Sequence, residues 1–291
     1  MITPKRRSPI QKRQWPLRKI DLGESVGSIF HMRIQLKDVE KTAQLCALFR
    51  GLKQFSDSIV LNLSPGGIDM QCLDSGCCCL LVCRLEKTWF EIYEFDQEND
   101  EPVLGFHSRT LHKVLGTRQE GQTIEITGSR EQDTVGFSFK REAQATAYDK
   151  FFQVPLISVD QEQLVPDERE SEVDLVLPTR RFVEVIGQLA LFDTAVTADF
   201  TEDGIEFVAT GPDGSMRVEL ALSDVDEYAI GDGHHVQESY SLSYLQSVGT
   251  FGRLSDEIKI GVSAERPLEA TYSLGDGSYT TFFLAPRIKD T

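Results

Sequence analysis

The residues best suited to chemistry in this 291-residue chain are six cysteines, all of which lie between Cys46 and Cys83. Cys77, Cys78 and Cys79 are consecutive, and neighbouring strand residues point to opposite faces, so these thiols are poorly placed to form disulfides with one another. A zinc site is the sharper alternative, but the cluster has no paired C-x-x-C spacing and no histidine. We therefore expect the cysteines to act as small apolar residues that pack in a buried strand, in a protein from a reducing compartment.

Other side-chain patterns that would indicate catalysis are absent from the sequence. His234 and His235 lie in a glycine-rich loop without carboxylate or cysteine partners at ligand spacing. There is no G-x-S-x-G, P-loop, G-x-G-x-x-G or H-E-x-x-H motif. The sequence thus predicts a protein that is not an enzyme, with no catalytic residues, no metal site and no cofactor.

Charge divides the chain into a short basic arm and an acidic body. Residues 1–29 carry seven basic and two acidic residues, a net charge of +5, so the remainder carries −21 of the total of −16. An acidic body argues against nucleic-acid binding over the whole surface, although basic residues confined to one face remain compatible with it. Prolines among the basic residues predict a flexible arm, which is a nuclear-import patch, a phosphate-contacting tail or a segment without a role.

No membrane-directed segment is recognisable in the sequence. The apolar runs are shorter than the roughly 18 residues that would span a bilayer. The amino-terminal residues contain no apolar core of a secretory signal. We therefore expect a protein with no membrane partner.

The elements that the sequence predicts fall into two copies of one unit. In the first half a helix over 38–55, with Asp38 as its N-cap, is followed by a strand over 58–63 and a second strand that starts Gly-Ile-Asp-Met at residue 67. The second half repeats helix, strand and turn, and its second strand starts Gly-Ile-Glu-Phe at residue 204, about 137 residues later. Such spacing indicates one structural unit that is duplicated along the chain.

Each predicted unit has a second, shorter helix, over 108–115 in the first half and 242–248 in the second. The remaining segments are strands of five to eight residues that are separated by turns. Many short strands with few helices predict an α+β fold, in which antiparallel sheets carry the helices on one face.

Four segments, in the right order, resemble the PCNA-type DNA sliding clamps. They are GIDMQCLD at 67–74, QLVPDE at 163–168, AERPL at 264–268 and TFFLAPRIKD at 281–290. The likeness extends over roughly residues 30–289, and the basic arm has no counterpart in a typical clamp. It agrees with the duplication, which was found independently of it.

The resemblance implies a duplicated clamp domain with antiparallel sheets outside and two short helices per domain on the inner face. Three such chains form a pseudo-sixfold ring in relatives. The expected divisions are an arm over 1–29, clamp domain 1 over 30–147, an interdomain connector over 148–170 and clamp domain 2 over 171–291.

The resemblance also implies a set of residues for each task of a clamp. The residues expected to face DNA are Arg50, Lys53, Arg109, His112, Lys113, Arg180 and Arg181. The expected pocket for a partner peptide is formed by Leu73, Leu164, Val165, Pro166, Pro267, Phe283, Ala285 and Pro286. The expected subunit interface is formed by Tyr148, Lys150 and Phe151 of one chain against Met216, Val218 and Leu220 of the next.

The implied function is that of a DNA sliding clamp, a processivity factor that encircles duplex DNA without reading its sequence. Implied partners are DNA polymerase and other proteins with short hydrophobic peptides, a clamp loader and two further copies of the chain, in the nucleus or at a viral replication site. Several channel positions that are basic in relatives are uncharged or acidic here, which predicts weak DNA association. The alternatives are a subunit of a heteromeric checkpoint-type clamp and a clamp-fold interaction protein that does not encircle DNA. The channel positions that lack a basic residue are Cys46, Ala47, Glu184, Gly187, Ser243 and Thr250.

Overall fold

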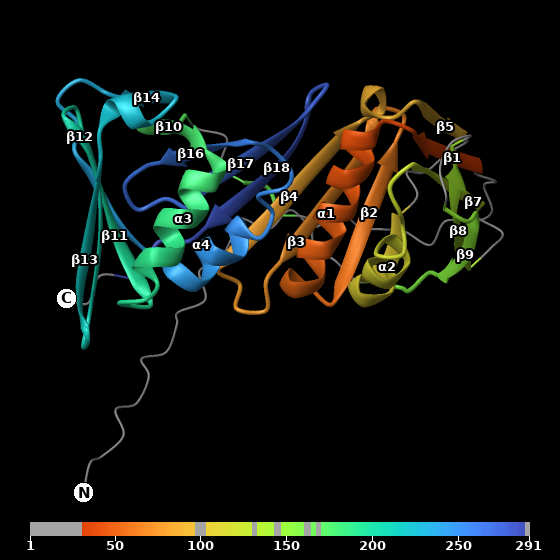
Figure 1. Ribbon diagram of the computed structural model, residues 1–291, viewed down its shortest axis with the longest axis horizontal. Coiled ribbons are helices and arrows are strands. Elements are labelled where there is room, and N and C mark those ends of the chain that lie inside the picture. The colour runs from red at the N-terminus through yellow and green to blue at the C-terminus, as the bar shows by residue number, and fades with distance from the viewer. Residues whose placement is uncertain are drawn as a thin grey trace, which may run out of the picture.

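The structure of the protein is a computed structural model that describes residues 31–96, 103–129, 133–142, 147–159, 164–166 and 170–288. The basic arm predicted for residues 1–29 lies outside these described residues. Figure 1 shows the helices in front of the long central sheet, with further strands of the two halves at the left and right ends of the view. No helix in these ranges is long and apolar enough to cross a membrane.

The amino-terminal unit contains nine strands and two α-helices among its described residues. Their bounds are β1 (His31–Leu36), α1 (Val39–Phe55), β2 (Ser58–Ser64), β3 (Gly67–Leu73), β4 (Cys79–Glu86), β5 (Ile92–Asp96), β6 (Val103–His107), α2 (Ser108–Leu115), β7 (Gln122–Ser129), β8 (Thr134–Arg141) and β9 (Lys150–Pro155), with a short 3-10 turn at Lys87–Trp89.

The carboxy-terminal unit contains the same number of elements in the same order. Their bounds are β10 (Val173–Pro178), α3 (Thr179–Leu189), β11 (Ala195–Thr201), β12 (Gly204–Gly211), β13 (Gly214–Leu220), β14 (Glu227–Ile230), β15 (Val236–Ser241), α4 (Leu242–Gly249), β16 (Glu257–Val262), β17 (Leu268–Gly275) and β18 (Ser278–Leu284), with a 3-10 turn at Leu222–Asp224.

The strand order confirms the duplication predicted from the sequence. One antiparallel sheet of the first unit has the order β5-β1-β7-β8-β9, and the equivalent strands of the second unit have the order β14-β10-β16-β17-β18. The other sheet is β6-β2-β3-β4 in the first unit and β15-β11-β12-β13 in the second. Strands β18 and β4 pair with each other, so two of these four sheets form one nine-stranded sheet across the domain junction.

A pair of tyrosines shows that the repeat extends to single side chains. The Tyr93 hydroxyl, on β5, donates to the carbonyls of Ser64 and Gly67 at the β2–β3 turn, both at 2.8 Å. The Tyr228 hydroxyl, on β14, donates to the carbonyl of Thr201 at the β11–β12 turn, also at 2.8 Å. Each tyrosine therefore links one sheet of its unit to the first hairpin of the other sheet in the same unit.

Helix α1 joins the two units through close packing. Its amino end is capped as predicted, since the Asp38 carboxylate accepts a hydrogen bond from the backbone N–H of Lys41 at 2.9 Å. Gly51 lies against the ring of Phe251, where a Cβ would meet ring carbons at 2.4 Å. Phe251 is buried and its ring centroid lies 4.8 Å from that of Phe282. A side chain at position 51 would therefore separate α1 from the second unit.

The sequence-based prediction missed three edge strands, β6, β14 and β15. A 3-10 turn precedes β5. The segment predicted as the connector begins with β9, which pairs antiparallel with β8. The backbone of that segment is thus part of the first unit's sheet up to Pro155, because β8 would otherwise leave its hydrogen-bonding groups open.

Candidate functional site

The helix layer of the amino-terminal unit carries a positively charged surface. Arg50 and Lys53 are exposed on α1, and Arg109 and Lys113 are exposed on the neighbouring helix α2. His112 lies among them, and its pKa is lowered by partial burial and by the positive charges of Lys53 and Arg50. The five side chains predicted to face DNA from this unit therefore lie on one surface with a shared positive field.

The helix layer of the carboxy-terminal unit is close to neutral. Arg180 and Arg181 are exposed in the first turn of α3, as predicted, and Glu184 follows them on the same helix. Helix α4 presents hydroxyl and amide side chains instead of charges. The exposed residues on α4 and immediately after it are Ser243, Gln246 and Thr250.

The outer face of the nine-stranded sheet carries the apolar residues expected to form the peptide pocket. Leu73 pairs with Leu80, and Leu80 pairs with Phe283, so the three side chains form one row across β3, β4 and β18. Leu80 is buried, whereas Leu73 and Phe283 are partly exposed. The row lies at the junction of the two units, and we name it the junction row.

The connector is fixed beside the junction row by one glutamine. Gln71 donates from Nε2 to the carbonyl of Leu164 at 2.9 Å and accepts from the backbone N–H of Leu164 at 3.0 Å. The pair of hydrogen bonds holds Leu164 as a strand neighbour would, and Leu164 is buried. Val165, next to it, is 47% exposed, and Pro166 is half-buried. The apolar side chain of Val165 is thus exposed to solvent beside the junction row.

The chain end completes this apolar surface. The Ala285 N–H donates to the carbonyl of Cys78 at 2.9 Å, and the Arg287 N–H donates to the carbonyl of Ser239 at 2.7 Å. Pro286, between them, is buried. The predicted pocket residues on the sheet, the connector and the chain end therefore surround one site, which we call the docking surface. Its members are Leu73, Leu80, Leu164, Val165, Pro166, Phe283, Ala285 and Pro286, with half-buried Pro267 on the turn before β17.

Strands β9 and β13 are open sheet edges with apolar side chains. Tyr148 and Phe151 are 77% and 69% exposed, and Lys150 donates from Nζ to the carbonyl of Thr117. On β13, Met216 and Val218 are partly buried, whereas Leu220 is only 4% exposed and belongs to the core. Long unpaired edges of this kind invite pairing with another chain.

Comparison with known proteins decides the family. The model of the amino-terminal domain of proliferating cell nuclear antigen matches residues 35–163, and that of its carboxy-terminal domain matches residues 165–287. The chain belongs to the proliferating cell nuclear antigen family. It is 23% identical over 252 residues to "Proliferating cell nuclear antigen 2" of Drosophila melanogaster and 27% identical over 257 residues to "Proliferating cell nuclear antigen" of Chaetomium thermophilum, each time covering 87% of this chain and 97% of the relative.

The family's clamp fold accounts for the repeat and for the antiparallel sheets behind four short helices. The two family models meet at residue 164, where Gln71 holds the connector. This glutamine was missed by sequence reasoning. Its place between the buried Met70 and Cys72 puts it on the opposite face of β3, but water satisfies most glutamines there, so no local signal indicated the connector as its partner.

The cysteines serve mainly as packing residues in this member of the family. Cys72, Cys79 and Cys83 are buried as predicted, and burial raises the pKa of Cys72 and of Cys83 to about 12. Cys77 and Cys78 differ from the prediction, since they are half-buried in the β3–β4 turn and do not lie in the strand. All six thiols are free, and no group of three metal-ligating side chains occurs in the described ranges.

The turn that holds these thiols ties the two units together. The Asp74 carboxylate accepts hydrogen bonds from the backbone N–H groups of Gly76, Cys78 and Cys79 at 2.6–2.7 Å. It also accepts one from the hydroxyl of Tyr244, on α4, at 2.7 Å. Burial and the carboxylate together raise the pKa of Tyr244, so the phenol stays protonated and remains a donor. Neither residue was singled out from the sequence.

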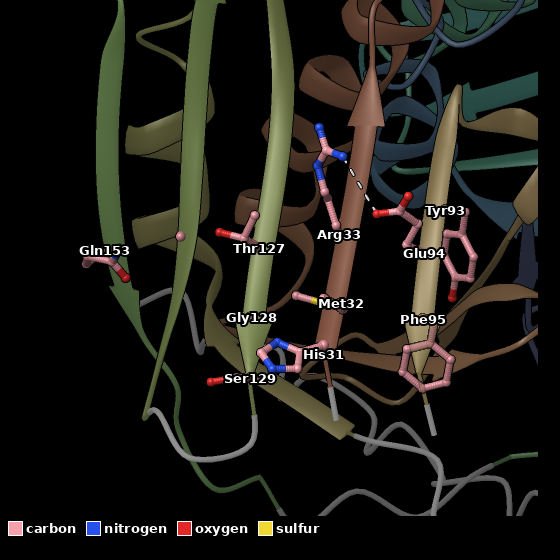
Figure 2. Close-up of a pocket in the computed structure, with 11 residues that line it drawn as sticks. His31, Met32, Arg33, Tyr93, Glu94, Phe95, Thr127, Gly128, Ser129 and Gln153 are labelled. Atoms are coloured by element: carbon pink, nitrogen blue, oxygen red, sulfur yellow. Dashed lines mark ion pairs between the residues drawn. The ribbon is translucent and has the colours of Figure 1, made fainter. Parts of the chain in front are cut away.

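A hollow of about 770 Å³ lies elsewhere, at one end of the five-stranded sheet. Figure 2 shows Arg33 of β1 beside Glu94 of β5, with Thr127 on the next strand. Arg33 pairs with Glu94 at 3.7 Å and with Glu125 at 2.9 Å, and Glu125 also accepts from Lys140 at 2.5 Å. These four charges balance one another, and His31, Thr127 and Ser129 also line the hollow.

Proposed function

We propose that the protein is a DNA sliding clamp, a non-enzymatic processivity factor in which three chains form a ring around duplex DNA. One observation carries the proposal. Within the chain, β18 of the second unit pairs with β4 of the first. The equivalent strands of the repeat, β9 and β13, are open edges. Pairing β9 of one chain with β13 of the next repeats the internal junction. A head-to-tail contact of this kind forms a ring when the rotation between neighbouring chains closes, and we propose that it closes after three chains.

The repeat also predicts the register of this contact. Rows of paired residues that cross each sheet can be matched between the two units. The match gives each residue of β9 a counterpart on β18, and each residue of β13 a counterpart on β4. The first pair of rows is Tyr93–Ile34–Ile126–Phe137–Phe152 and Tyr228–Leu175–Ile260–Ala270–Phe282. The second pair is Leu61–Met70–Cys83 and Ala198–Phe207–Val218.

Because Phe282 faces Leu81 at the internal junction, Phe152 is expected to face Met216 of the neighbouring chain. By the same transfer, Lys150 faces Val218. Phe152 and Met216 are both partly buried and both pack against their own core, so the predicted register brings two apolar groups together under the sheet. Phe151 then lies on the outer face, opposite Arg217.

The two candidate surfaces suit the two tasks of a clamp. The positive surface of α1 and α2 would line the channel, where contacts to phosphate hold duplex DNA without reading its sequence. The docking surface offers apolar side chains to a short hydrophobic peptide of a polymerase or another DNA enzyme. A clamp loader would be needed to open the ring, and such a protein works in the nucleus or at a viral replication site.

Retention on DNA of different topology tests the proposal. The protein is loaded with a clamp loader onto nicked circular DNA and passed through a sizing column at a salt concentration that abolishes phosphate contacts. We expect it to stay with circular DNA and to leave when one restriction cut makes the DNA linear, because a ring is held by topology. Equal loss from both forms would contradict encirclement.

A subunit of a heteromeric clamp is the second candidate, and one pair of residues favours it. The predicted register places Asp149, which immediately precedes β9, opposite Glu219 of the next chain, a like-charge pair at one end of the contact. Arg217 already pairs with both Glu206 and Glu219 at 2.6 Å, so it only partly neutralises this carboxylate. A partner chain with a basic residue in place of Asp149 would form a better contact.

A further inference from the structure

A groove of about 490 Å³ lies between the two units on the side where α1 begins. Its walls are the first turns of α1, the segment 252–257 that follows α4, and the end of β17. Figure 1 shows the start of α1 close to the β17–β18 hairpin. An ion pair of 2.6 Å between Lys41 and Asp276 fixes this neighbourhood. The groove belongs neither to the docking surface nor to the positive surface of α1 and α2.

The groove is lined by acids that lack counter-charges. Glu40, Asp256 and Glu257 are exposed, and their side chains form no ion pair within the described part of the chain. Two basic residues line the groove in the described part of the chain. Lys41 is paired with Asp276, and Arg253 has no acidic partner among the described residues. Three unpaired carboxylates against one free guanidinium make the groove attractive to cations.

A buried amide oxygen also points to a ligand with N–H groups. Gln44 lines the groove and is only 7% exposed. Its Nε2 donates to the carbonyl of Leu254 at 2.8 Å, which fixes the orientation of the amide. Its Oε1 has no hydrogen-bond partner in the described residues. A buried acceptor without a donor is costly, so a donor supplied from the groove would be stabilising.

We propose that the basic arm of this chain, residues 1–29, binds in this groove through its lysine and arginine side chains. The arm has a net charge of +5, whereas the rest of the chain has −21, so the charges are complementary. Lysine and arginine supply N–H donors for the three carboxylates and for Gln44 Oε1. The inference does not depend on the ring or on DNA binding.

The arm is long enough to reach the groove. It joins the body at His31, the first residue of β1, and the six residues of β1 span about 20 Å toward the start of α1. Eleven residues separate Lys19 from His31, and a flexible segment of that length has a typical end-to-end distance of about 18 Å and a limit of about 36 Å. The basic residues before Lys19 therefore lie within range, at the millimolar effective concentrations that short tethers give.

The arm has a built-in probe. The chain has two tryptophans, Trp15 in the arm and Trp89, which is fully buried and donates from Nε1 to the carbonyl of Leu274 at 2.9 Å. The test is acrylamide quenching of the full-length chain, with the signal of a Trp15→Phe variant subtracted as the Trp89 background. Acrylamide is uncharged, so the acidic body does not bias its approach to Trp15.

We expect quenching of Trp15 to rise about two-fold or more in the triple variant Glu40→Gln, Asp256→Asn, Glu257→Gln, and in the unmodified chain at about 1 M salt. The matched control removes three exposed acids outside the groove: Asp203→Asn, Asp213→Asn, Asp232→Asn. It should leave quenching unchanged. An equal rise in both triple variants would show that general charge attraction holds the arm, and it would overturn the groove as its binding site. Quenching in the unmodified chain as strong as in a free peptide of residues 1–29 would overturn binding altogether.

Discussion

The two helix layers share their buried positions and differ in their charged ones. Helix α1 buries Leu45, Leu48, Phe49 and Leu52, and α3 buries apolar residues at the same spacing, 137 positions later. Helices α2 and α4 align in the same way, 134 positions apart. The five basic or histidine positions Arg50, Lys53, Arg109, His112 and Lys113 then correspond to Gly187, Ala190, Ser243, Gln246 and Ser247.

The difference shows which constraints are imposed by the fold and which by the task. Apolar residues recur in both units because each helix must cover a sheet. The outward residues are free of that requirement, and the amino-terminal pair presents more of the charges that phosphates would need. We infer that each chain holds DNA mainly through its first unit, with Arg180 and Arg181 as a smaller contribution.

The largest expected effect comes from removing the charges of the first helix pair. Changing Arg50, Lys53, Arg109 and Lys113 to Gln should abolish measurable DNA association at low salt, and the slope of log K against log salt should fall by roughly 0.9 for each lost phosphate contact. Fluorescence anisotropy of a labelled duplex over a salt series measures both. The control, Arg180→Gln with Arg181→Gln, should lose less. An equal loss in the control would mean that the two layers contribute alike.

Two glycines should respond with opposite signs to the same substitution. Gly51→Ala should lower the free energy of unfolding by about 1–3 kcal/mol, because the new Cβ would lie 2.4 Å from the Phe251 ring. Gly187→Ala, on the open surface of α3, should raise it by about 0.5–1 kcal/mol, since no atom lies within 4 Å of its Cβ position. Urea denaturation compares the two. A stabilising Gly51→Ala would show that α1 does not need this close contact.

Restoring a charge to the second helix pair should have a moderate effect. Gly187 stands where the first unit has Arg50, so Gly187→Arg should strengthen duplex association at low salt and steepen the salt slope by roughly 0.9. Gly187→Gln is the control for side-chain size and helix propensity. If arginine and glutamine behaved alike in the anisotropy assay, α3 would not face the DNA.

The smallest effect concerns His112. Its pKa is lowered by partial burial and by Lys53 and Arg50, so the folded chain binds a proton less readily than the unfolded chain does. Stability should therefore fall as the pH drops below about 6.5, the ordinary histidine pKa. In His112→Gln this part of the loss should disappear, which thermal melts at pH 7.5 and pH 5.5 would detect. An unchanged pH dependence would show that protonation of His112 does not destabilise the folded chain.

The sequence was most informative where one residue type recurs with a helical or strand period. The apolar stripe of α1 and the Gly-Ile-acid-apolar tetrads predicted helices, hairpins and the repeat. Strand β15 was missed because its central residues, Gln237, Glu238 and Ser239, are polar, and only the pairing with β11 makes them a strand. The β18–β4 pairing was also out of reach, since an antiparallel partner two hundred residues away leaves no local signal.

Part of the docking surface has a local signal in the sequence. Leu164 and Val165 are apolar residues in a polar segment, and the resemblance to clamps named the rest. The resemblance places Leu220 at the subunit interface, and its buried side chain lies on the same face of β13 as the partly buried Met216 and Val218. The hydrogen bonds from Gln71 to Leu164 and from Tyr244 to Asp74 join residues 93 and 170 positions apart, so no sequence period could have indicated them.

The mass of the protein in solution tests the ring most directly. Light scattering over a dilution series should give the mass of three chains of 32.7 kDa each, and that mass should persist on dilution, because every open β9 edge would then be paired with a β13 edge. A single-chain mass at all concentrations would contradict a self-sufficient ring. It would favour the heteromeric clamp, in which the Asp149–Glu219 repulsion disfavours self-assembly.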